Sequence, residues 1–147
     1  MNIHVHLKVV GWLLLGLGFA HSFFYWLFDW GRELAHLSLL TRQIFLVHCF
    51  FISLSVMLMG VCTLWYTDVL LASGILSRVV LAGFLVFWSI RWAFQLWIYD
   101  PAIWRGRRFY TAMHAAFSVL WTYVVCVYGA ALHIAWTSTG LSSLAAR

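Results

Sequence analysis

The sequence predicts an all-α integral membrane protein in which four transmembrane helices form one antiparallel bundle. The first observation is composition: 65% of the 147 residues are apolar and 9% are charged, whereas soluble domains carry about 25% charged residues. The second is that the apolar residues form four blocks, each long enough to cross a hydrocarbon core of about 30 Å. The third is an aromatic content of 19% with ten tryptophans, which suits helix ends at a lipid interface. A chain of this length predicts a single membrane domain over residues 1–147.

The predicted spans cover residues 8–29, 42–66, 78–99 and 110–135. The first ends at a polar run that begins with Asp29. The third ends before Pro101, because proline disfavours helical geometry in the preceding residue. Thr41 and Ser77 are the predicted N-caps of the second and third spans, since a side-chain hydroxyl can accept from a free backbone N–H there.

The first loop, residues 31–41, contains leucines at every third position, Leu34, Leu37 and Leu40. This spacing predicts a short helix that lies on the membrane surface.

The orientation follows from the basic residues of the loops. The side with the first and third loops carries Arg32, Arg42, Arg105, Arg107 and Arg108. The other side carries Lys8, Arg78 and Arg147. This excess predicts that both termini lie outside the cytoplasm, in a bacterial inner membrane.

Several functions are disfavoured by the sequence. The net charge of +5 arises from short loops and therefore indicates topology rather than nucleic-acid binding. Cys49, Cys62 and Cys126 have no paired spacing and are predicted to be small buried residues without a disulfide. No nucleophile with an adjacent base, phosphate loop or carboxylate pair is recognisable, so no catalytic residue is predicted, and whether the chain is an enzyme is left open.

Five polar side chains fall inside the predicted spans, and such residues often mark function because burying them in a membrane costs free energy. They are His21, His48, Arg91, Gln95 and His114. Because the spans alternate in direction, all five lie in one leaflet, one to two helical turns below the surface with the first and third loops.

Each of these side chains shares a helical stripe with small, polar or aromatic residues. The third span aligns Phe84, Trp88, Arg91, Gln95 and Tyr99, and the fourth aligns Thr111, His114, Ser118, Trp121 and Val125. In an antiparallel bundle the four stripes would face one another. We therefore expect one polar chamber, with Tyr25 on the stripe of His21, and with Asp29 or Glu33 neutralising Arg91.

The first hypothesis for this chamber is haem b in a redox-type protein of electron transport. His48 and His114 are the preferred axial ligands, His21 can replace either, and Arg91 can pair with a propionate. The second is a non-haem metal site on His21, His48 and His114, completed by Glu33, Tyr25 or water.

The third hypothesis is a quinone, lipid or pigment pocket, in which Arg91 and Gln95 hold a carbonyl or an anionic headgroup between Trp88 and Trp92. Against all three stands a structural role, because polar side chains in spans often only bond across helices, for about 0.6 kcal/mol each. The chain would then be a cofactor-free accessory subunit of a larger respiratory or photosynthetic membrane complex. Its partners would be the lipid bilayer and other membrane subunits.

Overall fold

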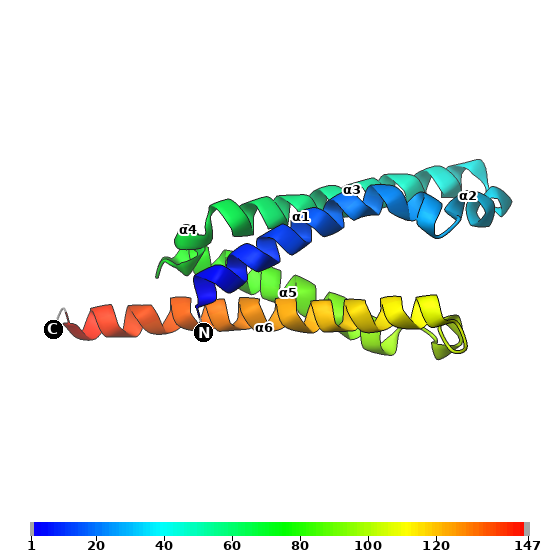
Figure 1. The fold of residues 1–147 in the computed structure, drawn as a ribbon. Coiled ribbons are helices and arrows are strands. Elements are labelled where there is room, and N and C mark those ends of the chain that lie inside the picture. Colours follow the sequence, from blue (N-terminus) through cyan, green and yellow to red (C-terminus); the bar gives the residue numbers. More distant parts are fainter. Residues whose placement is uncertain (1, 146–147) are drawn as a thin grey trace. The chain divides into compact units, whose positions relative to one another are not determined.

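Four long helices dominate the computed structural model, which describes the backbone of residues 2–145 and the side chains of residues 2–137 (Figure 1). They are α1 (Ile3–Leu27), α3 (Leu39–Trp65), α5 (Ile75–Trp97) and α6 (Arg108–Ala145). Short segments connect them: α2 (Trp30–Glu33), η1 (Leu34–His36), α4 (Thr67–Leu71) and η2 (Pro101–Ile103). All four long helices are long and apolar enough to cross a membrane. The prediction of an all-α chain with four candidate spans is confirmed.

The N-caps of α3 and α5 differ from the predicted ones. Ser38 caps α3, because its hydroxyl oxygen accepts from the backbone N–H of Thr41 at 3.2 Å. Gly74 is the N-cap of α5. The hydroxyl of Ser77 is buried and donates instead to the carbonyl of Val69 at 2.7 Å. The predictions of Thr41 and Ser77 as caps were wrong, because each helix begins three residues before the predicted span.

The first loop folds as two short helical segments, α2 and η1. Asp29 precedes α2 in the left-handed region, with φ 51° and ψ 37°, a conformation that aspartate tolerates better than most residues. Leu34 is buried, whereas Leu37 and Leu40 are exposed. A position of this loop on the membrane surface stays a prediction.

The chain divides into two compact units. Residues 8–67 form the α1–α3 unit, and residues 1–7 and 68–147 form the α5–α6 unit. A single domain and a four-helix bundle stay predictions.

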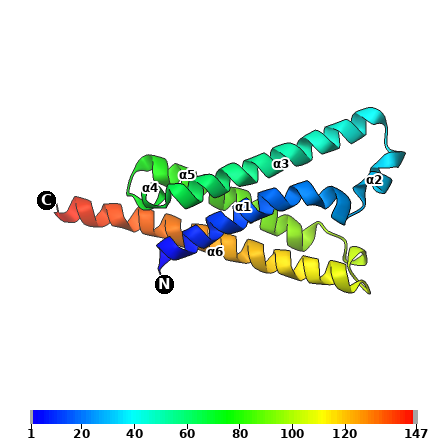
Figure 2. The ribbon, with the colours of Figure 1, turned by 45° about the horizontal axis from the view of Figure 1, so that its top comes forward.

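In the α1–α3 unit, the two helices run antiparallel and in close contact (Figures 1 and 2). A Cβ atom added to Gly11 would lie 2.8 Å from the Cβ of Leu64, and one added to Gly60 would lie 3.0 Å from the carbonyl oxygen of Gly11. Farther along, the hydroxyl of Ser53 donates to the carbonyl oxygen of Gly18 at 2.6 Å. Glycines therefore let the two backbones approach closely, as is common where membrane helices pack.

In the α5–α6 unit, the helices also form an antiparallel pair (Figure 2). The indole N–H of Trp92 donates to the hydroxyl of Thr122 at 2.9 Å. The N-terminal turn of the chain belongs to this unit. His6 Nδ1 lies 2.9 Å from the hydroxyl of Tyr123, and His4 Nδ1 lies 3.2 Å from a carboxylate oxygen of Asp68.

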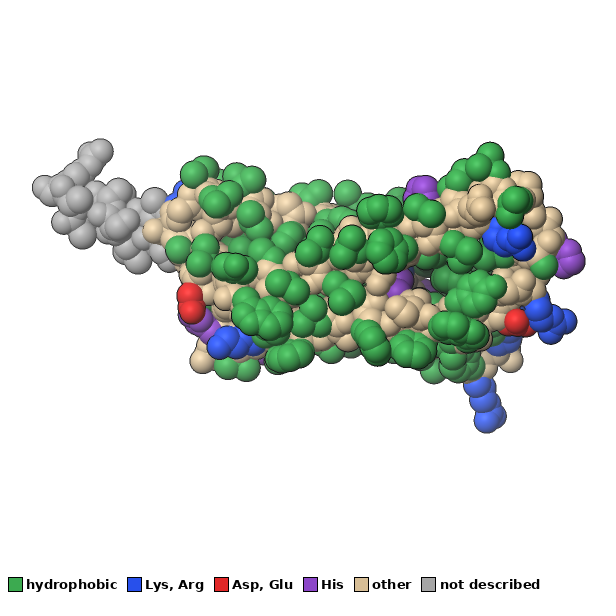
Figure 3. Space-filling view, turned by 90° about the horizontal axis from the view of Figure 1, so that it is seen from above, with side chains coloured by type: hydrophobic (Ala, Val, Ile, Leu, Met, Phe, Trp, Pro, Cys, Tyr) green, Lys and Arg blue, Asp and Glu red, His purple; other side chains and the backbone are tan. Residues whose placement is uncertain are grey.

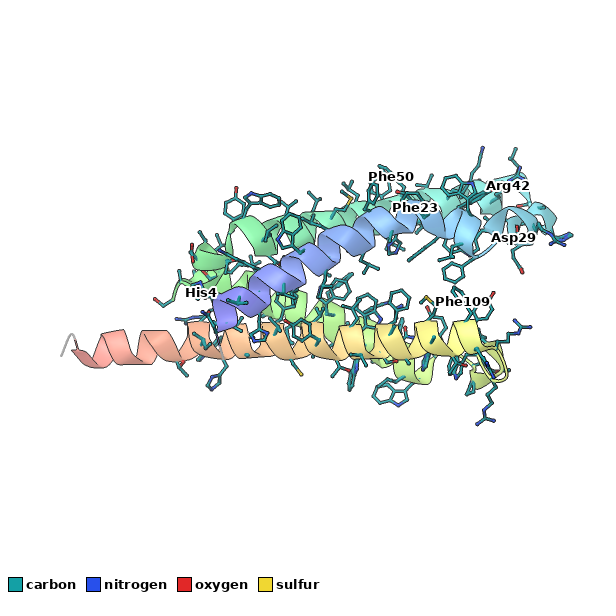
Figure 4. All side chains as sticks on the ribbon, in the orientation of Figure 1. His4, Phe23, Asp29, Arg42, Phe50 and Phe109 are labelled. Atoms are coloured by element: carbon teal, nitrogen blue, oxygen red, sulfur yellow. The ribbon has the colours of Figure 1, made fainter. Side chains whose placement is uncertain are left out.

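Apolar side chains are exposed along all four long helices. In Figure 3, hydrophobic side chains cover the helices of the face in view, and most charged side chains lie toward the helix ends. Phe23 on α1 and Phe50 on α3, labelled in Figure 4, are 54% and 63% exposed. Water would not tolerate so large an apolar surface, so the environment of these helices is a lipid bilayer.

Candidate functional site

The polar side chains of α5 and α6 form one connected group, here called the Arg91 cluster. Its members are Arg91, Gln95 and His114, with the aromatic residues Trp88, Trp104 and Trp121 around them. Arg91 lies six residues before the end of α5, and His114 lies six residues after the start of α6, which at 1.5 Å per residue places both about 9 Å inside their helices. The predicted stripes of the third and fourth spans meet where Gln95 contacts His114.

Gln95 is the central member of the cluster and only 5% exposed. It lies one helical turn after Arg91, and its Oε1 accepts from Nη1 of Arg91 at 3.2 Å. On the other side, its Nε2 lies 2.9 Å from Nδ1 of His114. Both hydrogen-bonding ends of a buried amide are thus satisfied, as burial requires.

Trp104 from the third loop covers the imidazole ring of His114. The two rings are stacked, with centroids 3.9 Å apart and an interplanar angle of 10°. The hydroxyl of Thr111 donates to the carbonyl oxygen of Trp104 at 2.7 Å, which ties the loop to the first turns of α6. His114 is therefore fixed at one edge by Gln95 and on one face by an indole.

The guanidinium of Arg91 lies over aromatic rings rather than beside a carboxylate. Its Cζ is 5.0 Å from the ring centroid of Trp121 and 5.8 Å from that of Tyr99, within the range of cation–π attraction. The two acidic residues of the α5–α6 unit are engaged elsewhere: Asp68 pairs with His4, and Asp100 accepts from the backbone N–H of Ala102. Within the described part of its unit, Arg91 therefore has no acidic partner.

The expected neutralisation of Arg91 by Asp29 or Glu33 stays a prediction. Asp29 pairs with Arg32 at 3.4 Å in the α1–α3 unit. Both side chains of that pair are largely exposed, so the pair contributes little to stability.

Two further donors of the cluster are buried without an acceptor. The indole rings of Trp88 and Trp121 are stacked at 4.9 Å, and the residues are 1% and 3% exposed. Neither Nε1–H has a hydrogen-bond partner in the described part of the chain. Leaving a buried donor unpaired costs about 1–3 kcal/mol, so these two N–H groups are the unsatisfied donors of the cluster.

His21 and Tyr25 line a separate cavity in the α1–α3 unit, of about 250 Å³. Its other lining residues are Ser22, Trp30, Leu46, Cys49, Phe50 and Ser53. The Nδ1 of His21 lies 2.9 Å from the carbonyl oxygen of Leu17. A carbonyl oxygen can only accept, so this nitrogen carries a proton, and in the neutral ring the Nε2 of His21 has the lone pair.

His48 is exposed on α3 and is not among the residues that line this cavity. Its Nδ1 lies 2.8 Å from the carbonyl oxygen of Ile44, so its Nε2 also keeps a lone pair. His21 and His48 belong to one unit and His114 to the other. The predicted ligation by His48 and His114 across one chamber stays a prediction.

Among the described residues, no group of three or more His, Cys, Asp or Glu side chains could hold a metal ion. The hypothesis of a metal site on His21, His48 and His114 is therefore not supported. Cys49, Cys62 and Cys126 are free thiols.

Arg91, Gln95 and His114 were predicted from the sequence, whereas the contact of Trp104 with His114 was not. Thr111 was the sequence feature that could have indicated this contact. It lies on the stripe of His114, and its hydroxyl donates to the backbone of Trp104. Trp92, expected to flank a ligand beside Trp88, instead bonds Thr122.

Comparisons of the chain with protein-family models, curated protein sequences and solved structures gave no match.

Proposed function

We propose that this chain is a small membrane protein that binds an amphipathic ligand at the Arg91 cluster, through a ligand oxygen with full or partial negative charge. The observation that carries the proposal is a guanidinium inside a membrane segment without an acidic partner in its unit. A charge at the bilayer centre costs about 2.5–3.5 kcal/mol on insertion scales, and Arg91, about 9 Å inside the end of its helix, would bear part of this cost. A hydrogen bond to a charged group contributes about 1.5–3 kcal/mol, so a bound oxygen would offset most of that cost.

A quinone is the ligand that suits this cluster best. The free polar groups are donors: the remaining N–H groups of Arg91 and the indole N–H groups of Trp88 and Trp121. A quinone has only acceptor oxygens on a flat apolar ring, and it is soluble in the bilayer. The chain would then serve electron transport, as a redox-type protein or as a subunit of a larger membrane complex. The phosphate of an anionic lipid offers the same acceptor chemistry, so the test must separate the two sources.

The test is a quinone titration of the purified protein in detergent, followed by quenching of tryptophan fluorescence. Arg91→Gln should weaken binding by about 10- to 150-fold, the equivalent of about 1.5–3 kcal/mol. Arg105→Gln is the matched control, because it removes the same charge from an exposed loop residue. Native mass spectrometry with phosphatidylglycerol provides the lipid arm. Arg91-dependent retention of that lipid without saturable quinone binding would assign the site to a headgroup. If neither ligand distinguishes the two variants, the proposal is wrong.

Haem b is the second candidate, and the protonation of His21 and His48 favours it. A metal-ligating histidine usually donates one ring N–H to a carbonyl and presents its other nitrogen to the metal. His21 and His48 both meet this condition, whereas the Nδ1 of His114 is engaged by Gln95. If haem binds, an absorption spectrum should show a Soret band that is lost in His21→Ala or His48→Ala and kept in His114→Ala. A colourless protein would exclude this candidate.

The proposed setting is a bacterial inner membrane, in which the four spans form one antiparallel bundle with the first loop at the surface. The excess of arginines in the first and third loops supports a cytoplasmic position for these loops and an outer position for both termini. A C-terminal alkaline phosphatase fusion should therefore be active. Activity of a cytoplasmic reporter at the same position would reverse the orientation.

A further inference from the structure

We infer that His114 donates to an acceptor atom of the ligand through its Nε2–H, and that Gln95 is the positioning residue that fixes this tautomer. The inference rests on the proposed function for the identity of the ligand. The tautomer itself follows from the hydrogen bonds of the cluster.

The direction of the hydrogen bonds is set at Arg91. A guanidinium has donors only, so the amide atom that faces it at 3.2 Å must be the carbonyl oxygen of Gln95. The other end of the amide, 2.9 Å from His114 Nδ1, is then the NH2 group. Because that group only donates, Nδ1 of His114 must accept and carries no proton. A neutral imidazole has one N–H, which is therefore on Nε2.

His114 thus differs from the other two histidines of the predicted chamber. In His21 and His48 a carbonyl oxygen holds the proton on Nδ1, whereas in His114 an amide N–H excludes it from there. His114 therefore presents an N–H donor at Nε2. A metal ion binds a nitrogen lone pair, so this tautomer does not suit metal ligation through Nε2. It is suited to a carbonyl or anionic oxygen.

The surroundings of His114 hold that donor in place. Gln95 is 5% exposed and bonded at both ends, and the stacked indole of Trp104 restrains the imidazole plane. In the described part of the chain, no protein group accepts a hydrogen bond from Nε2 of His114. A ligand would therefore meet a cationic donor at Arg91 and a neutral donor at His114 through separate acceptor atoms, because the amide of Gln95 lies between the two side chains.

The first part of the test measures the tautomer without a ligand. Nitrogen-15 spectra of histidine-labelled protein in micelles distinguish protonated from unprotonated ring nitrogens, and His114→Gln assigns the resonances. The expected result is a protonated Nε2 and an unprotonated Nδ1. Gln95→Glu should exchange the two, because a carboxylate can only accept and would require a proton on Nδ1. A wild-type protein with the proton on Nδ1 would overturn the inference, whatever the quinone titration gives.

The second part compares two amide substitutions of His114. The amide nitrogen of glutamine can reach the position of Nε2, whereas that of asparagine reaches only that of Nδ1. Both variants lose the stacked imidazole, so each controls for the other. His114→Asn should bind a short-chain benzoquinone about tenfold more weakly than His114→Gln, the order expected for one lost hydrogen bond. Equal affinities would remove His114 from the ligand contacts. Equal affinities of Arg91→Gln and Arg105→Gln would instead overturn the proposed function and leave the tautomer standing.

Discussion

The contact between α1 and α3 predicts an unequal response of two glycines in the same helix. Gly11 faces α3, and a Cβ added there would lie 2.8 Å from the Cβ of Leu64 and 3.0 Å from its backbone Cα and N atoms. Gly16 is exposed five residues later, and a Cβ added there would meet nothing within 4 Å. The pair Gly11→Ala and Gly16→Ala therefore makes the same chemical change with and without a helix contact.

The expected magnitude follows from these distances. Carbon atoms are at their optimal separation at about 3.5–4.0 Å, so the alanine at position 11 requires the helices to separate. Overpacking of this kind costs about 1–3 kcal/mol. The gain in helix propensity from glycine to alanine, about 1 kcal/mol, is common to both variants and cancels in the comparison. Gly11→Ala should therefore be less stable than Gly16→Ala by about 1–3 kcal/mol.

Thermal unfolding in detergent can measure this difference through a thiol-reactive fluorophore, because the chain has three free cysteines. Cys62 is partly buried on α3, two residues before Leu64. For a domain of this size, 1 kcal/mol shifts Tm by about 2–4 °C, so Gly11→Ala should melt about 2–12 °C below Gly16→Ala. A melting temperature of Gly11→Ala at or above that of Gly16→Ala would refute the close approach of the two helices.

A second glycine in the same contact provides an independent check. A Cβ added to Gly60 on α3 would lie 3.0 Å from the carbonyl oxygen of Gly11 and 3.0 Å from the backbone nitrogen of Leu15. Gly60→Ala should therefore be destabilised relative to Gly16→Ala as well. Because Gly11 and Gly60 touch, the double variant should lose less than the sum of the two single losses. Strict additivity would mean that the two sites act separately.

Three further changes test other parts of the fold in the same melting assay. Gly106 has φ +76°, so Gly106→Ala should destabilise by about 1 kcal/mol, and no loss would indicate that the turn is not left-handed in solution. Ser53→Ala removes the hydrogen bond to the carbonyl of Gly18 and should cost about 0.6 kcal/mol, with about 1.7 kcal/mol as the upper limit seen for such bonds; a stabilised variant would contradict this contact. Trp92→Phe removes the donor to Thr122, and a double-mutant cycle with Thr122→Val should give a coupling of about the same size, whereas zero coupling would remove the bond.

Sequence patterns predicted the functional cluster only in part. Arg91 and Gln95 are one turn apart on one helix, so their alignment follows from helical periodicity alone. That His114 joins them required the third and fourth spans to pair with their polar stripes facing each other. Alternating span direction suggested this arrangement, and the 2.9 Å bond between Gln95 and His114 confirms it. The stacking of Trp104 on His114 could not be predicted, because it depends on how an irregular loop returns to the helix.

Helix boundaries were less predictable for a related reason. Apolar periodicity locates the part of a helix that lies in lipid, but a cap depends on backbone geometry before the apolar block begins. Ser38 therefore caps α3, three residues before the predicted cap Thr41.

The apolar blocks alone were enough to predict a helical, membrane-embedded chain, because blocks of this length have few other stable arrangements in lipid. The sequence also predicted that five polar side chains lie at one depth, since depth follows from position along a helix. The contact of Gln95 with His114 depends on the pairing of α5 with α6, whereas the carbonyl partners of His21 and His48 lie one turn earlier in their own helices. Gln95 beside His114, and carbonyl oxygens beside His21 and His48, make chemically different groups out of three residues that the sequence presents as equivalent.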